Sequence, residues 1–268
     1  MSFLQRLHPV WAAVRHAFVG KPSQRLSHPF LRELHSQVIA PALKPIPEFA
    51  PLENLREQWL QDQTTITITD YGAGSKHHQG PERKISNLAR HSLTPARFSQ
   101  LLALLIRHLG ITQVAELGTS LGLNSLYLSK AIGTNGHLTT FEGCPNLAQR
   151  AKTLFAGNSQ ITVIPGNLDT TWPTFLQSTK PLQLIYFDAN HRLAPTLHYF
   201  EACLSHLTEH AVLVFDDIHW SSEMEQAWRQ IKQHPKVRLT LDVYEAGLVF
   251  LGPNLPTGHY HIAWPLRG

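Results

Sequence analysis

The sequence VAELGTSLGLNSLYLSKA, at residues 114–131, joins a short apolar run to a turn with two glycines and then to apolar residues at helical spacing. A strand, a tight turn and a helix in this order form the first part of a βαβ unit. Glycines let the turn backbone approach a ligand, and the start of the helix offers free N–H groups. The stretch therefore predicts a ligand-binding turn in an α/β protein.

The same alternation continues through the second half of the chain. Strands are expected at 113–117, 137–142, 161–164, 182–188, 211–216, 237–243 and 247–251, and helices from residue 94 and near 122–132, 145–156, 193–206 and 221–233. Right-handed βαβ crossovers at this spacing give a doubly wound, mostly parallel, Rossmann-like sheet of seven strands. The last two strands are too close for a helical crossover, so they are expected to form an antiparallel hairpin.

Residues 1–93 are predicted to be an N-terminal helical extension, and residues 94–268 the main domain. Helices are expected at about 29–39 and 52–61, a short strand at 64–70 and a flexible basic loop with glycines at 72–84. One further helical face carries Leu4, Leu7, Trp11, Val14 and Phe18. Such a stripe packs on the main domain or forms a homodimer contact. We expect the main domain to fold without residues 1–45.

Composition and charge exclude several classes of protein. Of 268 residues 43% are hydrophobic and 16% charged, so the chain can bury a core. Two cysteines make no disulfide scaffold. With neither a long apolar span nor a signal peptide, a cytoplasmic protein is expected. Residues 1–45 hold six of the 23 Lys and Arg but one of the 19 Asp and Glu, so the basic charge belongs to this segment.

Acidic residues lie at the ends of four of the predicted strands, where the ligand of an open parallel sheet binds. They are Glu142, Asp188 and the pair Asp216–Asp217, while Glu116 precedes the first turn. That turn lacks the GxGxxG pattern that approaches a pyrophosphate, and a carboxylate beside it favours a cationic ligand. A nucleoside such as S-adenosylmethionine is thus favoured over NAD.

These residues resemble class I S-adenosylmethionine-dependent methyltransferases, in the form of small-molecule O-methyltransferases. The resemblance rests on VAELGTSLGLNSLYLSKA, TFEGCPNLAQRA, IPGNLD, LIYFDANH and LVFDDIHW, which occur in the family's order over residues 94–251. It implies that the methionine part of the cofactor lies near Glu116, Gly118, Thr119 and Ser120, its ribose near Glu142, its adenine near Asn167, Leu168 and Asp169, and its sulfonium or amine near Asp188.

The subgroup most similar in motif is the cation-dependent catechol and caffeoyl-coenzyme A O-methyltransferases. The resemblance implies a site for Mg²⁺ or another divalent cation at Asp188, Asp216 and Asp217, where Asp217 replaces the family's Asn and His191 its catalytic Lys. Without a metal, His191 or His219 is the general base, because histidine titrates near neutral pH, and Asp217 orients a histidine.

The expected activity is transfer of a methyl group from S-adenosylmethionine to a nucleophile, with oxygen favoured, on a small-molecule acceptor. Two alternatives stay open. One is a non-catalytic protein on the same fold that docks on nucleic acid or a membrane through residues 1–45, although solvation of this segment is the commoner role and nucleic acid is not favoured as a partner. The other is an NAD-dependent oxidoreductase, which the missing GxGxxG disfavours.

Overall fold

The computed structural model describes residues 28–69 and 80–264 of the chain. The predicted helical face from Leu4 to Phe18 and most of the loop at 72–84 lie outside these residues. The described chain forms two compact units, one of them Ser36–Ser178 and the other made of the residues on either side of it. The boundary between residues 93 and 94 stays a prediction.

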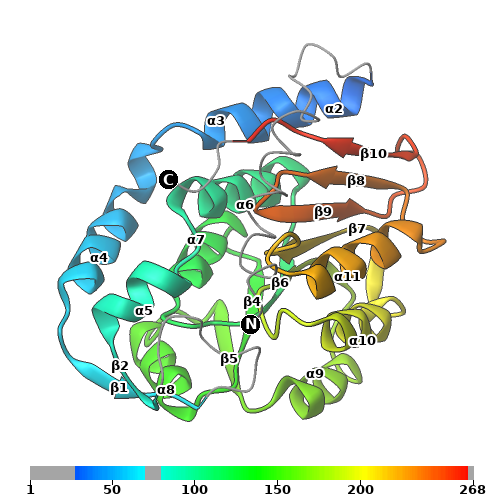
Figure 1. Cartoon of the computed structure of the whole chain (residues 1–268). Coiled ribbons are helices and arrows are strands. Elements are labelled where there is room, and N and C mark those ends of the chain that lie inside the picture. The colour runs from blue at the N-terminus through cyan, green and yellow to red at the C-terminus, as the bar shows by residue number, and fades with distance from the viewer. Residues whose placement is uncertain (1–27, 70–79, 265–268) are drawn as a thin grey trace. The chain divides into compact units, whose positions relative to one another are not determined.

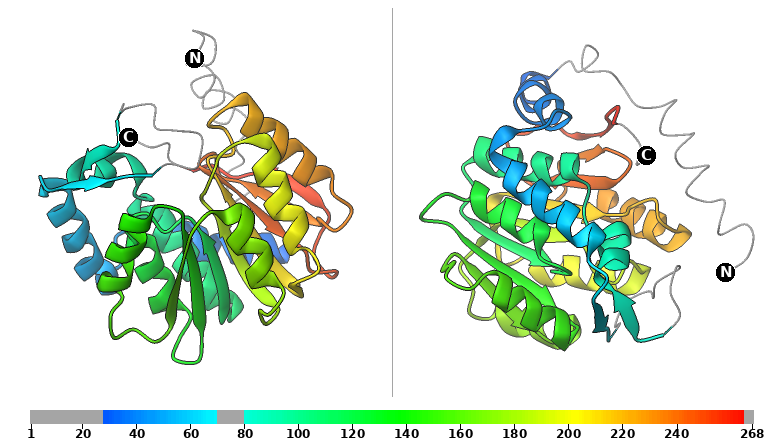
Figure 2. Two further views of the ribbon diagram at one scale, coloured as in Figure 1. Left: turned by 90° about the horizontal axis from the view of Figure 1, so that it is seen from below. Right: turned by 90° about the vertical axis from the view of Figure 1, so that its left-hand side faces the viewer.

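The unit Ser36–Ser178 is built on three parallel strands, in the order β3-β4-β5. They are β3 (Gln113–Leu117), β4 (His137–Glu142) and β5 (Ile161–Pro165). The helices that alternate with them are α6 (Ala96–Leu109), α7 (Leu123–Ala131), α8 (Pro145–Leu154) and α9 (Leu168–Leu176). Figure 2 shows these strands in green between helices of the same unit. Because helices cover them, β3 and β4 are buried along nearly their whole length.

The chain before these strands is mostly helical, as expected. Its elements are η2 (His35–Ile39), α3 (Ala40–Ala42), η3 (Pro47–Phe49), α4 (Ala50–Gln61), β1 (Thr65–Thr67), β2 (Glu82–Lys84) and α5 (Ile85–Ser92). The prediction of a loop through residue 84 was wrong at its end, because β2 pairs antiparallel with β1. Alternating polar and apolar residues in β1 were recognised, but the partner strand Glu82–Lys84 carries three charged residues and gives no such pattern.

The other unit contains five strands, in the order β10-β8-β9-β7-β6. They are β6 (Leu182–Phe187), β7 (Leu207–Asp216), β8 (Leu239–Asp242), β9 (Ala246–Phe250) and β10 (Gly258–His261). The helices are α2 (Pro29–Leu34), α10 (Leu193–Cys203) and α11 (Ser222–Gln233). In Figure 1, β8, β9 and β10 lie side by side. The predicted hairpin is confirmed, since β9 is antiparallel to β8 and also to β7.

The mostly parallel α/β class is therefore confirmed, with differences in detail. The sequence missed β10, which pairs in parallel with β8 and adds a strand to the seven expected. It also missed α5 and α9. In α9 the signal was present, because the side chain of Asn167 caps the helix and Trp172 and Leu176 lie four residues apart on a buried face.

Candidate active site

The turn between β3 and α7 requires unusual backbone angles. Gly118 and Gly122 have φ values of +111° and +87°, and Ser120 adopts a φ of +51° without being glycine. A Cβ at residue 122 would lie 2.7 Å from Cζ of Phe155, so glycine is needed here for both conformation and packing. Residue 120 in the left-handed region turns its N–H towards the end of β4.

Glu116, in β3, is held entirely within the protein. It is 1% exposed, and its carboxylate accepts hydrogen bonds from Asn124 (2.8 Å), Thr140 (2.7 Å) and the hydroxyl of Ser125. A buried carboxylate needs such donors to remain charged. These bonds join β3 to α7 and β4 and fix the turn, while the buried hydroxyl of Thr119 bonds Thr140 at 2.7 Å.

Glu142 ends β4 beside the turn. One of its oxygens accepts the backbone N–H of Ser120 at 2.8 Å and the other accepts that of Cys144, also at 2.8 Å. Two N–H groups on one carboxylate fix its orientation. The structure thus brings Glu142 and Ser120, both predicted from the sequence, into direct contact.

Asn167, Leu168 and Asp169 lie at the start of α9, after β5. The side chain of Asn167 accepts the N–H of Asp169 at 3.0 Å and caps the helix. Asn167 and Leu168 are half-buried and Asp169 is exposed. The backbone approaches β4 here, because the N–H of Gly166 bonds the carbonyl of Glu142 at 2.9 Å.

In the other unit, Asp188 and His191 lie together after β6. Nε2 of His191 is 3.5 Å from Oδ1 of Asp188, and both side chains are about one-fifth exposed. Asn190 between them has a φ of +61°. Its side chain donates to the hydroxyl of Tyr199 on α10 at 3.4 Å. An imidazole beside a carboxylate, with partial access to solvent, has the arrangement of a general base.

Asp216 and Asp217 separate at the end of β7. Asp216 is 4% exposed, whereas Asp217 takes a φ of +53° in the following turn and donates its N–H to the carbonyl of Glu245 at 2.8 Å. Within residues 28–69 and 80–264, no three His, Cys, Asp or Glu side chains are placed to hold a metal ion. The set Asp188, Asp216 and Asp217 is therefore not supported as a cation site, because its last two carboxylates diverge in burial and backbone direction.

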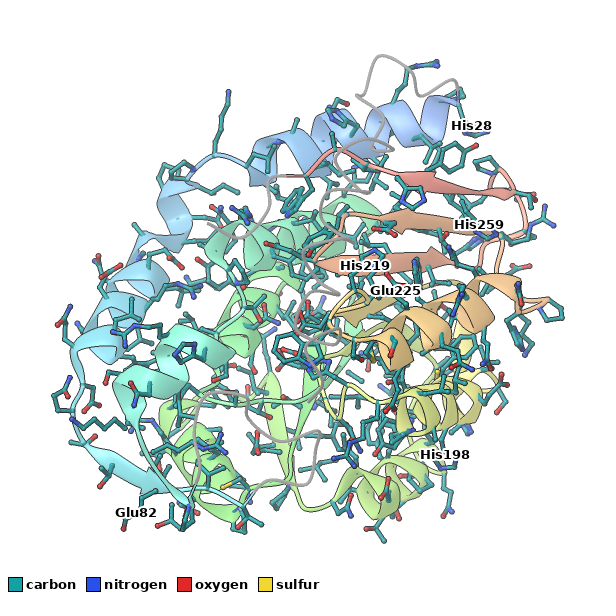
Figure 3. All side chains as sticks on the ribbon, in the orientation of Figure 1. His28, Glu82, His198, His219, Glu225 and His259 are labelled. Atoms are coloured by element: carbon teal, nitrogen blue, oxygen red, sulfur yellow. The ribbon has the colours of Figure 1, made fainter. Side chains whose placement is uncertain are left out.

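His219 lies between two carboxylates. Its Nδ1 is 3.1 Å from Oε1 of Glu225, its Nε2 is 3.0 Å from Oδ2 of Asp242, and its ring stacks on Tyr244. His219 and Glu225 are neighbours in Figure 3. Burial by itself lowers the pKa of His219, but the hydrogen bonds and charges of Asp242 and Glu225 outweigh it and raise the pKa above its usual value.

This contact set is what sequence reasoning missed. Asp242 ends β8 and Glu225 lies in the first turn of α11, and neither position has a motif. The available signal for Asp242 was a carboxylate at the end of an apolar strand, which is the same signal that identified Glu142. A histidine with both nitrogens bonded to carboxylates has no free position for an acceptor's proton.

A protein family model matches the middle part of the chain. Residues 115–218, which include the β3–α7 turn and every strand end from β3 to β7, match the family model of a methyltransferase domain. Over residues 115–218 the chain is similar to a methyltransferase domain. Comparison with curated protein sequences gives no match.

Solved structures similar to this chain include three that are described as O-methyltransferases. One is from Streptomyces achromogenes, is involved in tomaymycin synthesis and was solved with S-adenosylmethionine; it is 22% identical, with a TM-score of 0.53 over 60% of this chain and 82% of that one. Another, from Bacillus cereus with S-adenosylhomocysteine, is 16% identical, with a TM-score of 0.57 over 82% of this chain and 99% of that one.

The third is a protein from Staphylococcus aureus considered a caffeoyl-CoA O-methyltransferase. It is 17% identical, with a TM-score of 0.55 over 62% of this chain and 88% of that one. At these identities the likeness shows the fold, which is the Rossmann-like methyltransferase fold that the sequence predicts. Among the described helices, none is long and apolar enough to cross a bilayer.

Proposed function

We propose that this methyltransferase domain uses S-adenosylmethionine to methylate an oxygen of a small-molecule acceptor. The observation that carries the proposal is the carboxylate of Glu142, fixed by two N–H groups at the end of β4 and directly beside the left-handed turn at Ser120. Vicinal ribose hydroxyls are donors, and a carboxylate held at this strand position is the acceptor that an adenosine cofactor requires.

The residues of the unit Ser36–Ser178 fit this cofactor in further respects. The turn at Gly118–Ser120 would face its methionine part, while Asn167, Leu168 and Asp169 would border its adenine. Glu116 would act by holding the turn, because it is 1% exposed and its carboxylate bonds Asn124, Ser125 and Thr140. That Asp188 contacts the sulfonium or amine stays a prediction from the family resemblance. The bound cofactor would supply an electrophilic methyl group on a sulfonium.

His191 is the general base of the proposal. Its imidazole would take the proton of the acceptor's hydroxyl, which makes the oxygen a nucleophile for the methyl group that the cofactor would supply. Asp188, 3.5 Å away, stabilises the imidazolium that results. His219 is not assigned this role, because Glu225 and Asp242 already engage both of its nitrogens.

The acceptor class rests on similarity to the O-methyltransferases described above and on the histidine base. Oxygen acceptors lose a proton on methylation, so a positioned base contributes directly to the rate. Residues 28–93 precede the domain's motifs and are proposed to shape acceptor specificity. The small-molecule reading agrees with the absence of any net basic charge in the chain after residue 45.

Two measurements test the proposal. Calorimetry should give binding of S-adenosylmethionine or S-adenosylhomocysteine, with NAD and ATP bound much more weakly. A library of small hydroxylated and amine-containing compounds should then be screened for release of S-adenosylhomocysteine. Preferred binding of NAD would overturn the cofactor assignment, whereas turnover with amines alone would overturn the oxygen acceptor and leave the cofactor assignment in place.

A further inference from the structure

One histidine connects three separate elements around the turn that follows β7. His219 itself lies in the segment between β7 and α11, Glu225 belongs to the first turn of α11, and Asp242 ends β8. The ring of Tyr244, in the turn between β8 and β9, stacks on the imidazole at 5.5 Å with an interplanar angle of 19°. Asp242 and Tyr244 are distant from His219 in the sequence but lie close to it in space.

Hydrogen bonding defines the charge of this histidine. A neutral imidazole carries one N–H and can donate to one carboxylate, whereas an imidazolium donates from both nitrogens. Here both nitrogens lie within 3.1 Å of carboxylate oxygens. Asp242 is 3% exposed, so its charge requires a nearby cation and donors. The N–H of Tyr244, at 3.0 Å, is one such donor, and His261 lies 3.4 Å from the same carboxylate.

The same turn between β8 and β9 also holds Asp217. The carbonyl of Glu245 accepts the N–H of Asp217 at 2.8 Å, and the side chain of Glu245 accepts the indole N–H of Trp264 at 3.1 Å. Asp217 and Tyr244 both have left-handed backbone angles, with φ values of +53° and +65°. Strained residues persist where surrounding contacts over-determine them.

We propose that His219 is a positioning residue, a positively charged clamp that holds the Asp216–Asp217 turn against the β8–β9 turn through Asp242 and Glu225. It carries no proton to or from the acceptor. By fixing the turn at the end of β7, it keeps one wall of the acceptor site in place for His191. The inference about catalysis rests on the proposed methyl transfer, but the clamp itself does not.

The test uses the full chain and measures hydrogen exchange at the backbone N–H of Asp217, which lies in the turn that the clamp holds. In His219→Gln, one side-chain amide replaces two N–H donors and leaves a carbonyl oxygen facing a carboxylate. We expect the backbone N–H of Asp217 to exchange at least about tenfold faster than in the wild type. In His219→Gln with Glu225→Gln, the second amide can donate to the first, and most of the protection should return. Glu225→Gln alone should have a smaller effect.

His259→Gln is the matched control. His259 is an exposed histidine on β10 of the same unit, it bonds Thr240 of β8 at 2.9 Å, and Figure 3 labels it apart from His219. Its replacement should leave the exchange of Asp217 unchanged. Equal exchange in His219→Gln and the wild type would overturn the clamp, and so would a failure of the double variant to recover protection, because a purely steric role gives no recovery on removal of a charge.

Kinetics then separate positioning from proton transfer. With an acceptor found by the screen, His219→Gln should raise KM for the acceptor about tenfold, with a smaller change in kcat. In the double variant, KM should return part of the way to the wild-type value. A loss confined to kcat with normal Asp217 exchange would instead make His219 a catalytic base. If the wild type binds no S-adenosylhomocysteine, the proposed function fails, and the exchange experiment still decides the clamp.

Discussion

At the scale of single residues, Glu142 is the clearest test of the cofactor assignment. Replacement by Ala removes the proposed acceptor for two ribose hydroxyls and leaves the N–H groups of Ser120 and Cys144 without the carboxylate that they bond. We expect binding of S-adenosylhomocysteine to weaken by about 1–3 kcal/mol, as measured by calorimetry. Glu82→Ala, at an exposed carboxylate in β2, should leave the dissociation constant unchanged. An unchanged constant in Glu142→Ala would make Glu142 purely structural.

A variant of His191 tests its proposed role as the general base. His191→Gln keeps the size and polarity of the side chain but removes a base that can accept a proton. We expect kcat to fall by about 10²–10⁴, with the affinity for S-adenosylhomocysteine within twofold of the wild type. Wild-type turnover in His191→Gln would transfer the role of base to another group, and a parallel loss of cofactor affinity would place His191 in the cofactor site instead.

His219 should also make stability depend on pH. Its pKa is raised in the folded protein, because Asp242 and Glu225 outweigh the effect of burial. A raised pKa stabilises the fold fully below the unfolded value of about 6.5, and this stabilisation is lost as pH rises through the folded pKa. Urea unfolding should therefore show the largest gap between the wild type and His219→Gln below pH 6.5, and a smaller gap towards pH 9. A gap that grows with pH would contradict this sign.

At the scale of elements, the turn between β3 and α7 depends on Gly122. In Gly122→Ala a Cβ would meet Phe155 at 2.7 Å, and the left-handed φ of +87° adds strain. We expect a loss of about 2–4 kcal/mol in the free energy of unfolding, measured with urea. Gly133→Ala is the matched control, since Gly133 also has a positive φ but nothing within 4 Å of the added Cβ. It should lose about 1 kcal/mol, and equal losses would show that packing on Phe155 is unimportant.

Some helices and strands could be predicted from the sequence and others could not. Buried parallel strands and the helices between them have strong apolar patterns, so β3 to β9 were recognised. Short elements stabilised by pairing, such as the charged β2, carry little pattern of their own. At the site, residues at strand ends such as Glu142 could be found from chain order alone. The bonds from His219 to Asp242 and Glu225 could not, because they depend on how β8 and α11 meet in space.

At the scale of the whole molecule, the segment before residue 46 contributes more than the sequence suggested. Leu31 and Leu34 are each 1% exposed, and the ring of Phe30 packs edge-on against Phe250 with centroids 5.6 Å apart. Farther along, the side chain of Gln100 donates to the carbonyl of Ala42 at 3.2 Å and accepts the N–H of Ile46 at 2.8 Å. That the main domain folds without residues 1–45 stays a prediction, and these contacts indicate that such a deletion lowers its stability.

Two truncations test how much α2 adds to stability. Deletion of residues 1–27 keeps every contact just described, whereas deletion of residues 1–45 removes α2 and exposes the apolar surfaces that it covers. Each buried leucine is worth about 2 kcal/mol, and in a chain of this size 1 kcal/mol shifts Tm by about 2–4 °C. We expect the longer deletion to melt at least about 10 °C below the shorter one in differential scanning calorimetry, and to aggregate at lower concentration. Leu34→Ala in the full chain should reproduce part of the loss. Equal melting temperatures for the two truncations would show that α2 adds nothing to the stability of the methyltransferase domain, and residues 28–45 would then be free to serve the acceptor instead.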